Sequence, residues 1–91
     1  MTTKTVSFNQ KGIRKLPDNK PVVYKILTER DKNNYTGVAG RGHVQERLMD
    51  HLRGGHDYVP GAKVHIEQMG TIIEARMKET RIIARTKPPH N

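Results

Sequence analysis

Two short apolar runs, each carrying a tyrosine, flank a polar turn, and this pattern constrains the fold more than any other part of the chain. Residues 22–27 are rich in β-branched and aromatic side chains that alternate between two faces, which is typical of a β-strand. Residues 31–34 suit a turn, because asparagine tolerates a positive φ. The chain returns over residues 35–39, so the pattern predicts an antiparallel hairpin that carries Tyr24 and Tyr35.

Gly37 leaves a gap on the second strand of this hairpin. It follows Tyr35 by two residues and shares its face, so the surface beside that tyrosine lacks a side chain. Such a gap suits the close approach of a ligand backbone. A glycine-rich loop of residues 40–42, which carries Arg41, leads from the strand into the next element.

An amphipathic helix is predicted over residues 43–52, ended by the glycines at 54–55. Its buried stripe consists of apolar residues that recur at every fourth position: Val44, Leu48 and Leu52. Arg47 and His51 are also four residues apart, so they stack on one flank of that stripe.

A third strand over residues 63–68 and a long C-terminal helix complete the predicted elements. Thr71 and Glu74 form a capping box that starts this helix, which continues to residue 85 or 86 before two prolines end it. We therefore expect an α+β domain with a small three-stranded, mainly antiparallel sheet flanked by helices.

The first twenty residues differ from the rest in composition. Residues 1–20 contain five Lys or Arg and one Asp, with few apolar side chains. We interpret them as a basic N-terminal lead-in, with a short strand near residues 5–8 that could add to a sheet edge and with a possible role in phosphate contact. Residues 21–91 form the predicted domain.

Glu79 stands out on the last helix. At 100° per residue, it falls in the middle of the apolar face, which is formed by Ile72, Ala75, Ile82 and Ile83. Lys78, Arg81 and Arg85 lie opposite, as a basic surface. An unpaired buried carboxylate costs several kcal/mol. One interpretation is a structural ion pair with an arginine or a helix end open to water, and the other is a cleft carboxylate that binds a divalent cation such as magnesium.

The charge of the chain favours a polyanionic partner. The formal net charge is +8, from 17 Lys and Arg against 9 Asp and Glu, and nucleic acid is the simplest match. The alternative is a solvated basic surface without a specific partner. The absence of cysteine excludes disulfide and thiolate chemistry. No apolar run long enough for a membrane span and no signal-peptide pattern is present, so we expect a soluble, cytoplasmic protein.

The hairpin and the following helix resemble the GIY-YIG nuclease superfamily, and the resemblance extends over residues 21–91. The tripeptide at residues 22–24 (VVY) stands where the family has GIY, and residues 35–37 (YTG) stand where it has YIG. Arg47, with His51 one turn later, is similar to the family's helix motif.

The last helix and the tail extend the resemblance. Glu79 and Asn91 have the spacing found in the incision nuclease of bacterial nucleotide-excision repair. The valines at 22–23 and the threonine at 36 depart from the consensus. Val38 replaces the polar residue that often follows the YIG glycine, and Arg41 could substitute for it. The chain ends at Asn91 without the further domains of larger members, so we expect a near-minimal, single-domain member.

This resemblance implies metal-dependent hydrolysis of phosphodiester bonds in DNA and a role in DNA repair. Glu79 would coordinate one Mg²⁺ or Mn²⁺, and Arg47 would hold phosphate oxygens. Tyr24 or Tyr35 would position or deprotonate the attacking water, which requires a lowered phenol pKa. His51 would share in proton transfer or hold a phosphate.

Further residues are expected on the substrate side, and several alternatives stay open. Gly37, Arg41 and Asn91 are predicted to help bind the substrate, Asn91 by fixing the tail beside the tyrosines. The tyrosines could instead be ordinary half-buried strand residues, and His51 a surface histidine. Arg47 could merely pair with Glu79. The competing function is a non-catalytic nucleic-acid-binding module. DNA versus RNA, the substrate's structure and the oligomeric state are not predicted.

Overall fold

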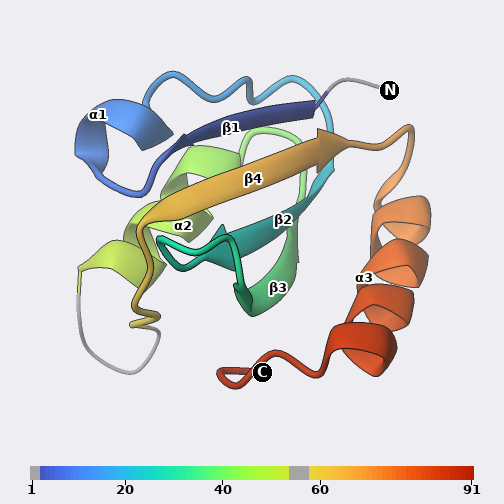
Figure 1. Cartoon of the computed structure of the whole chain (residues 1–91). Helices are drawn as coiled ribbons and strands as arrows, with labels where there is room; N and C mark the ends of the chain where they lie inside the picture. Colours follow the sequence, from blue (N-terminus) through green and yellow to red (C-terminus); the bar gives the residue numbers. More distant parts are fainter. Residues whose placement is uncertain (1–2, 54–57) are drawn as a thin grey trace.

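The hairpin strands and their neighbours form a four-stranded antiparallel sheet (Figure 1), described here from a computed structural model covering residues 3–53 and 58–91. Strands β2 (Val22–Leu27) and β4 (Lys63–Gln68) have the predicted bounds and lie in the centre. Strand β3 (Asn33–Ala39) forms one edge and β1 (Thr3–Ser7) the other, in the order β1-β4-β2-β3. The α+β class is confirmed, and the predicted sheet of three strands is corrected to four.

The helices cover both faces of this sheet (Figure 1). Helices α1 (Gln10–Ile13) and α2 (Val44–Leu52) lie on the face that carries the larger core. Helix α3 (Ile72–Thr86) covers the other face, where Ala75 and Ile82 pack with Val23 and Met69. Alternation along β2 therefore separates two cores, because successive side chains of a strand point to opposite faces.

The N-terminal residues belong to the same core as the hairpin. β1 pairs with β4 from Thr3↔Glu67 to Ser7↔Lys63. Phe8, Ile13 and Leu16 are buried in the cluster that contains Tyr24. The predicted lead-in thus supplies an edge strand, a short helix and core side chains, because its few apolar residues all turn inward.

The turn and the two long helices were predicted with small differences. The positive φ in the hairpin occurs at Asp31 (64°), not at an asparagine, and β3 begins at Asn33. Helix α3 starts as predicted, with the Thr71 hydroxyl accepting a hydrogen bond of 3.2 Å from the Glu74 amide. The predicted glycine end of α2, at residues 54–55, lies outside the described residues.

One residue of the basic surface expected on α3 has an acidic partner. Lys78 does not simply face solvent, because its ammonium forms an ion pair with Glu67 of β4.

No helix in residues 3–53 and 58–91 has the length and apolar character needed to cross a membrane.

Candidate active site

The two hairpin tyrosines lie side by side on the face covered by α2. Tyr24 pairs across the ladder with Gly37, and Tyr35 pairs with Ile26. The two rings are stacked, with centroids 6.2 Å apart. Tyr24 is fully buried, whereas Tyr35 on the edge strand is half-buried. Tyr35 is therefore the tyrosine with access to solvent.

Gly37 makes room for Tyr24. A Cβ placed on Gly37 would lie 2.5 Å from the hydroxyl oxygen of Tyr24 and 3.0 Å from Cε1 of Tyr35. The first distance is too short for a non-bonded contact, and the second is tighter than most such contacts. The gap that the sequence placed here is thus occupied by the Tyr24 ring, and a ligand backbone does not have that space in this conformation.

His51 is bound to Tyr24 inside the core. Its Nε2 lies 2.7 Å from the Tyr24 hydroxyl oxygen, and only 2% of the residue is exposed. Its ring centroid is 4.8 Å from that of Tyr35 and 5.7 Å from that of Tyr24. This burial excludes the interpretation of His51 as a surface histidine and places it behind both tyrosines.

Arg47 brings a positive charge to the same hydroxyl. Its residue is exposed, yet a side-chain hydrogen bond and its charge both act to lower the pKa of Tyr24. Burial has the larger, opposite effect, reinforced by Tyr35, so the pKa of Tyr24 is raised well above its ordinary value. Tyr24 is thus a protonated phenol at neutral pH. The Tyr24 hydroxyl thus lies between the Arg47 guanidinium, which can only donate, and Nε2 of His51, and the tautomer of the histidine sets the direction of the second hydrogen bond.

Glu79 lies on α3, the helix that covers the other face of the sheet from Tyr24. It lies on α3 between the buried residues Ala75 and Ile82 and is itself half-buried. Burial raises the pKa of its carboxyl, and Arg76 one turn earlier opposes this rise. Its charge also contributes to the raised pKa of Tyr24, so the carboxylate lies within electrostatic reach of the phenol.

The carboxylate of Glu79 limits the kind of metal site that is possible near Tyr24. Within residues 3–53 and 58–91, no three His, Asp or Glu side chains lie together as a ready metal site. Magnesium, however, is often held by one or two carboxylates together with substrate phosphates and water. The hard oxygen donors and partial burial of Glu79 fit that mode, and a bound cation would favour its charged form.

The remaining predicted residues differ in what they contact. Asn91 forms two hydrogen bonds to the backbone of Thr36, from Thr36 N to Oδ1 and from Nδ2 to Thr36 O, both 2.9 Å long. It fixes the tail against β3 and uses both ends of its amide. Arg41 is exposed in the loop beyond the end of β3, and no described contact joins it to Tyr24 or Glu79.

One residue outside the predicted set positions this site. Asp18 accepts hydrogen bonds of 2.8 Å from Val44 N, at the start of α2, to its carboxylate, and from Gly42 N to its main-chain oxygen. It therefore caps the helix that carries Arg47 and His51. The sequence gives no signal for this cap, because the aspartate lies 26 residues before the helix.

The sequence was also compared with protein-family models, with curated proteins and with solved structures, and none of them matches it.

Proposed function

We propose that this protein is a metal-dependent endonuclease of the GIY-YIG type that hydrolyses phosphodiester bonds in DNA, with a role in repair. One observation carries the proposal. Four residues to which the resemblance assigns chemistry come from β3, α2 and α3 and lie within hydrogen-bonding, ring-contact or electrostatic reach of the buried Tyr24 phenol: Tyr35, Arg47, His51 and Glu79. A hydrolytic site needs a carboxylate and a cationic side chain beside the groups that orient water, and this cluster offers both.

Arg47 and Glu79 would form the phosphate side of the site. The exposed guanidinium of Arg47 can hold phosphate oxygens through paired N–H donors and stabilise the charge that develops during cleavage. Glu79 would hold the divalent cation, which when bound supplies polarisation of the scissile phosphate and stabilisation of the leaving oxygen. The chain carries these two groups on different helices, α2 and α3.

The tyrosines would have different roles. Tyr35, which solvent can reach, would orient the attacking water at its hydroxyl oxygen. Tyr24 stays protonated, accepts a hydrogen bond from Arg47 and is hydrogen-bonded to Nε2 of His51, so it holds both side chains in place. We assign the water-orienting role to Tyr35 because solvent can reach it, and because the buried Tyr24 phenol with its raised pKa is the poorer base.

A second function is favoured by a specific observation. Tyr24 and His51 are as buried as ordinary core residues, with 0% and 2% of their surfaces exposed. A non-catalytic DNA-binding module would use the same basic surface, and in it Tyr24 and His51 would serve only to stabilise the fold. Such a module would bind DNA with steep salt dependence and no requirement for metal, and it would have no use for a carboxylate near the phosphate.

Cleavage assays separate these two functions. The protein is incubated with supercoiled plasmid, labelled duplex and single-stranded oligonucleotides in Mg²⁺ or Mn²⁺, beside Glu79→Ala and the matched variant Glu29→Ala. Glu29 is an exposed acid in the hairpin turn, so both variants lose one negative charge. We expect Glu79→Ala to lose about 100-fold or more in cleavage rate while binding DNA as before, and Glu29→Ala to cleave normally.

Two results of this assay would contradict the proposal. If the wild-type protein cleaves none of these substrates faster than the Glu79→Ala protein does, the nuclease function is wrong. Parallel loss of binding and cleavage in Glu79→Ala would instead assign Glu79 to folding or to the general electrostatic surface.

A further inference from the structure

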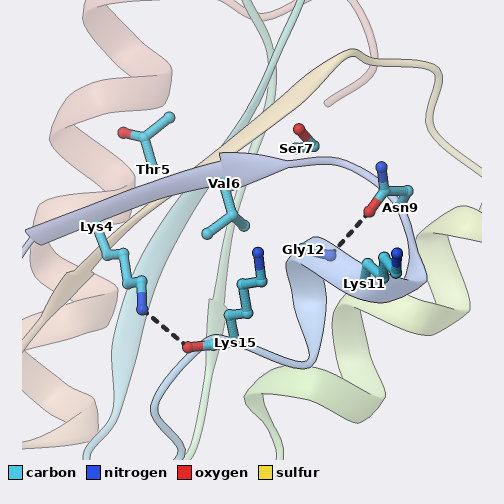
Figure 2. A pocket seen from close by; sticks show the side chains of 8 residues that line it. All are labelled: Lys4, Thr5, Val6, Ser7, Asn9, Lys11, Gly12 and Lys15. Carbon is cyan, nitrogen blue, oxygen red and sulfur yellow. Dashed lines mark hydrogen bonds between the residues drawn. The ribbon is translucent and has the colours of Figure 1, made fainter.

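A pocket of about 520 Å³ lies between β1 and α1, away from the tyrosines. Figure 2 shows the side chains that line it, among which the three lysines come from the strand, the short helix and the residues after it: Lys4, Lys11 and Lys15. The other lining residues are polar or small, apart from Val6, and no acid is among them. Three ammonium groups around one hollow repel one another, and a bound anion would relieve that repulsion.

The acids that form ion pairs do so with cations outside this pocket. The ion pairs found within residues 3–53 and 58–91 join Lys63 to Asp31, Lys78 to Glu67 and His43 to Glu46. Asp18, the acid of the first twenty residues, caps α2 through its carboxylate. The lysine pocket is thus a concentration of positive charge without a neutralising carboxylate in its lining.

Two contacts hold the pocket in shape. The Lys4 ammonium donates a 3.0 Å hydrogen bond to the main-chain oxygen of Lys15, visible as a dashed line in Figure 2. Gly12 lets α1 approach β1 closely, because a Cβ there would lie 2.0 Å from the oxygen of Ser7. The Lys4 ammonium, which this hydrogen bond holds in place, loses less conformational entropy on binding than a free lysine does.

The sheet register relates this pocket to the tyrosine site. Lys4 pairs with Ile66, Ile66 with Tyr24, and Tyr24 with Gly37. Residues in one such row share a sheet face, so Lys4 lies on the face of Tyr24 at the opposite edge. Two interstrand steps of about 4.8 Å separate Lys4 from Tyr24, the residue that Arg47 contacts, by roughly 10 Å. This separation corresponds to about three base pairs of duplex rise.

We infer that the pocket formed by Lys4, Lys11 and Lys15 binds backbone phosphates of DNA outside the one held at Arg47. This inference rests on the proposed function for the identity of the partner as DNA. It assigns the N-terminal strand and helix to substrate binding, whereas the hairpin, α2 and α3 carry the chemistry. The contact is sequence-independent, because it reaches only phosphate.

Binding measurements with matched charge variants test it. The affinity for a fluorescein-labelled 24-base-pair duplex is measured by fluorescence anisotropy in EDTA at several salt concentrations. The pocket variant is Lys4→Gln/Lys11→Gln/Lys15→Gln, and the control is Lys20→Gln/Arg30→Gln/Lys32→Gln, which removes the same charge from exposed positions elsewhere.

We expect the pocket variant to bind about tenfold or more weakly at low salt, with a slope of log K against log salt smaller by about 2 to 3. The control should lose about threefold or less in affinity. Circular dichroism checks the fold of each variant, and Lys11→Gln/Lys15→Gln, which keeps the Lys4 hydrogen bond, decides the question if the triple variant is unfolded. Equal losses in pocket and control variants would overturn the inference.

The two proposals fail in different ways. The binding assay contains no metal, so its result does not depend on cleavage. If the wild-type protein shows no metal-dependent cleavage but the pocket variant binds DNA weakly, the phosphate site stands and the nuclease function is wrong. If the wild-type protein cleaves DNA but the pocket variant binds it normally, the nuclease function stands and the phosphate site is wrong.

Discussion

Replacing Gly37 with alanine tests how Tyr24 is held beneath the edge strand. The added Cβ would lie 2.5 Å from the Tyr24 hydroxyl oxygen, 2.6 Å from its Cζ and 3.0 Å from Cε1 of Tyr35. Non-bonded carbon atoms normally stay about 3.5–4.0 Å apart, so the Tyr24 ring would have to move by about 1 Å. Tyr24 is fully buried between β2 and α2, and such a shift would disturb its neighbours.

The size of the effect follows from two contributions. An extra methyl group forced into a packed core costs about 1–3 kcal/mol. The movement also weakens the 2.7 Å hydrogen bond between Tyr24 and His51, which adds roughly 1 kcal/mol for a buried pair. We expect Gly37→Ala to lower the free energy of unfolding by about 2–4 kcal/mol, and the melting temperature by on the order of 10–20 °C in a domain of this size.

Urea unfolding followed by far-ultraviolet circular dichroism measures this loss. Gly40→Ala is the matched control, because a Cβ there meets its nearest atom, Cδ2 of His43, at 3.9 Å. That variant should stay within about 0.5 kcal/mol of the wild type. If Gly37→Ala unfolds at the same urea concentration as Gly40→Ala, the packing of Tyr24 against Gly37 is wrong, and so is the tyrosine arrangement derived from it.

Two further predictions concern Glu79 and the tail. Burial raises the pKa of Glu79 although Arg76 opposes it, so charging this carboxyl weakens the fold as pH rises through that pKa. Glu79→Gln should therefore raise the urea midpoint at pH 7, with a gain that shrinks toward pH 4; a gain independent of pH would contradict this. Asn91→Ala removes both hydrogen bonds to Thr36, and amide exchange at Thr36 should accelerate at least about tenfold, whereas the exposed control His90→Ala should leave it unchanged.

The strands and the long helices could be predicted because their signals are local. The bounds of β2 and β4 follow from alternation over six residues each. The start of α3 follows from Thr71, whose hydroxyl is three residues from the amide it accepts. The burial of Ala75 and Ile82 likewise follows from the helical period.

The missing parts depend on contacts between distant residues. A short edge strand was expected near residues 5–8, and β1 occupies Thr3–Ser7, but its one partner, β4, lies about sixty residues away in sequence, so the pairing itself had no local signal. Four-residue helix α1 is too short for periodicity to appear. The cluster itself was grouped by resemblance, but no local rule predicts that Tyr24 is buried and Tyr35 accessible. That difference arises because β2 is central and β3 is an edge.

The position of β3 at the edge explains why the candidate site lies there. An edge strand exposes backbone groups that other chains could pair with. Here the tail covers part of that edge, through Asn91 on Thr36 and a 3.0 Å hydrogen bond from His90 N to Asn34 O. Tyr35 lies between these two anchored residues, so its ring is held on the strand while one side stays open to solvent. A water-orienting phenol needs both properties, and the central strand could provide only the first.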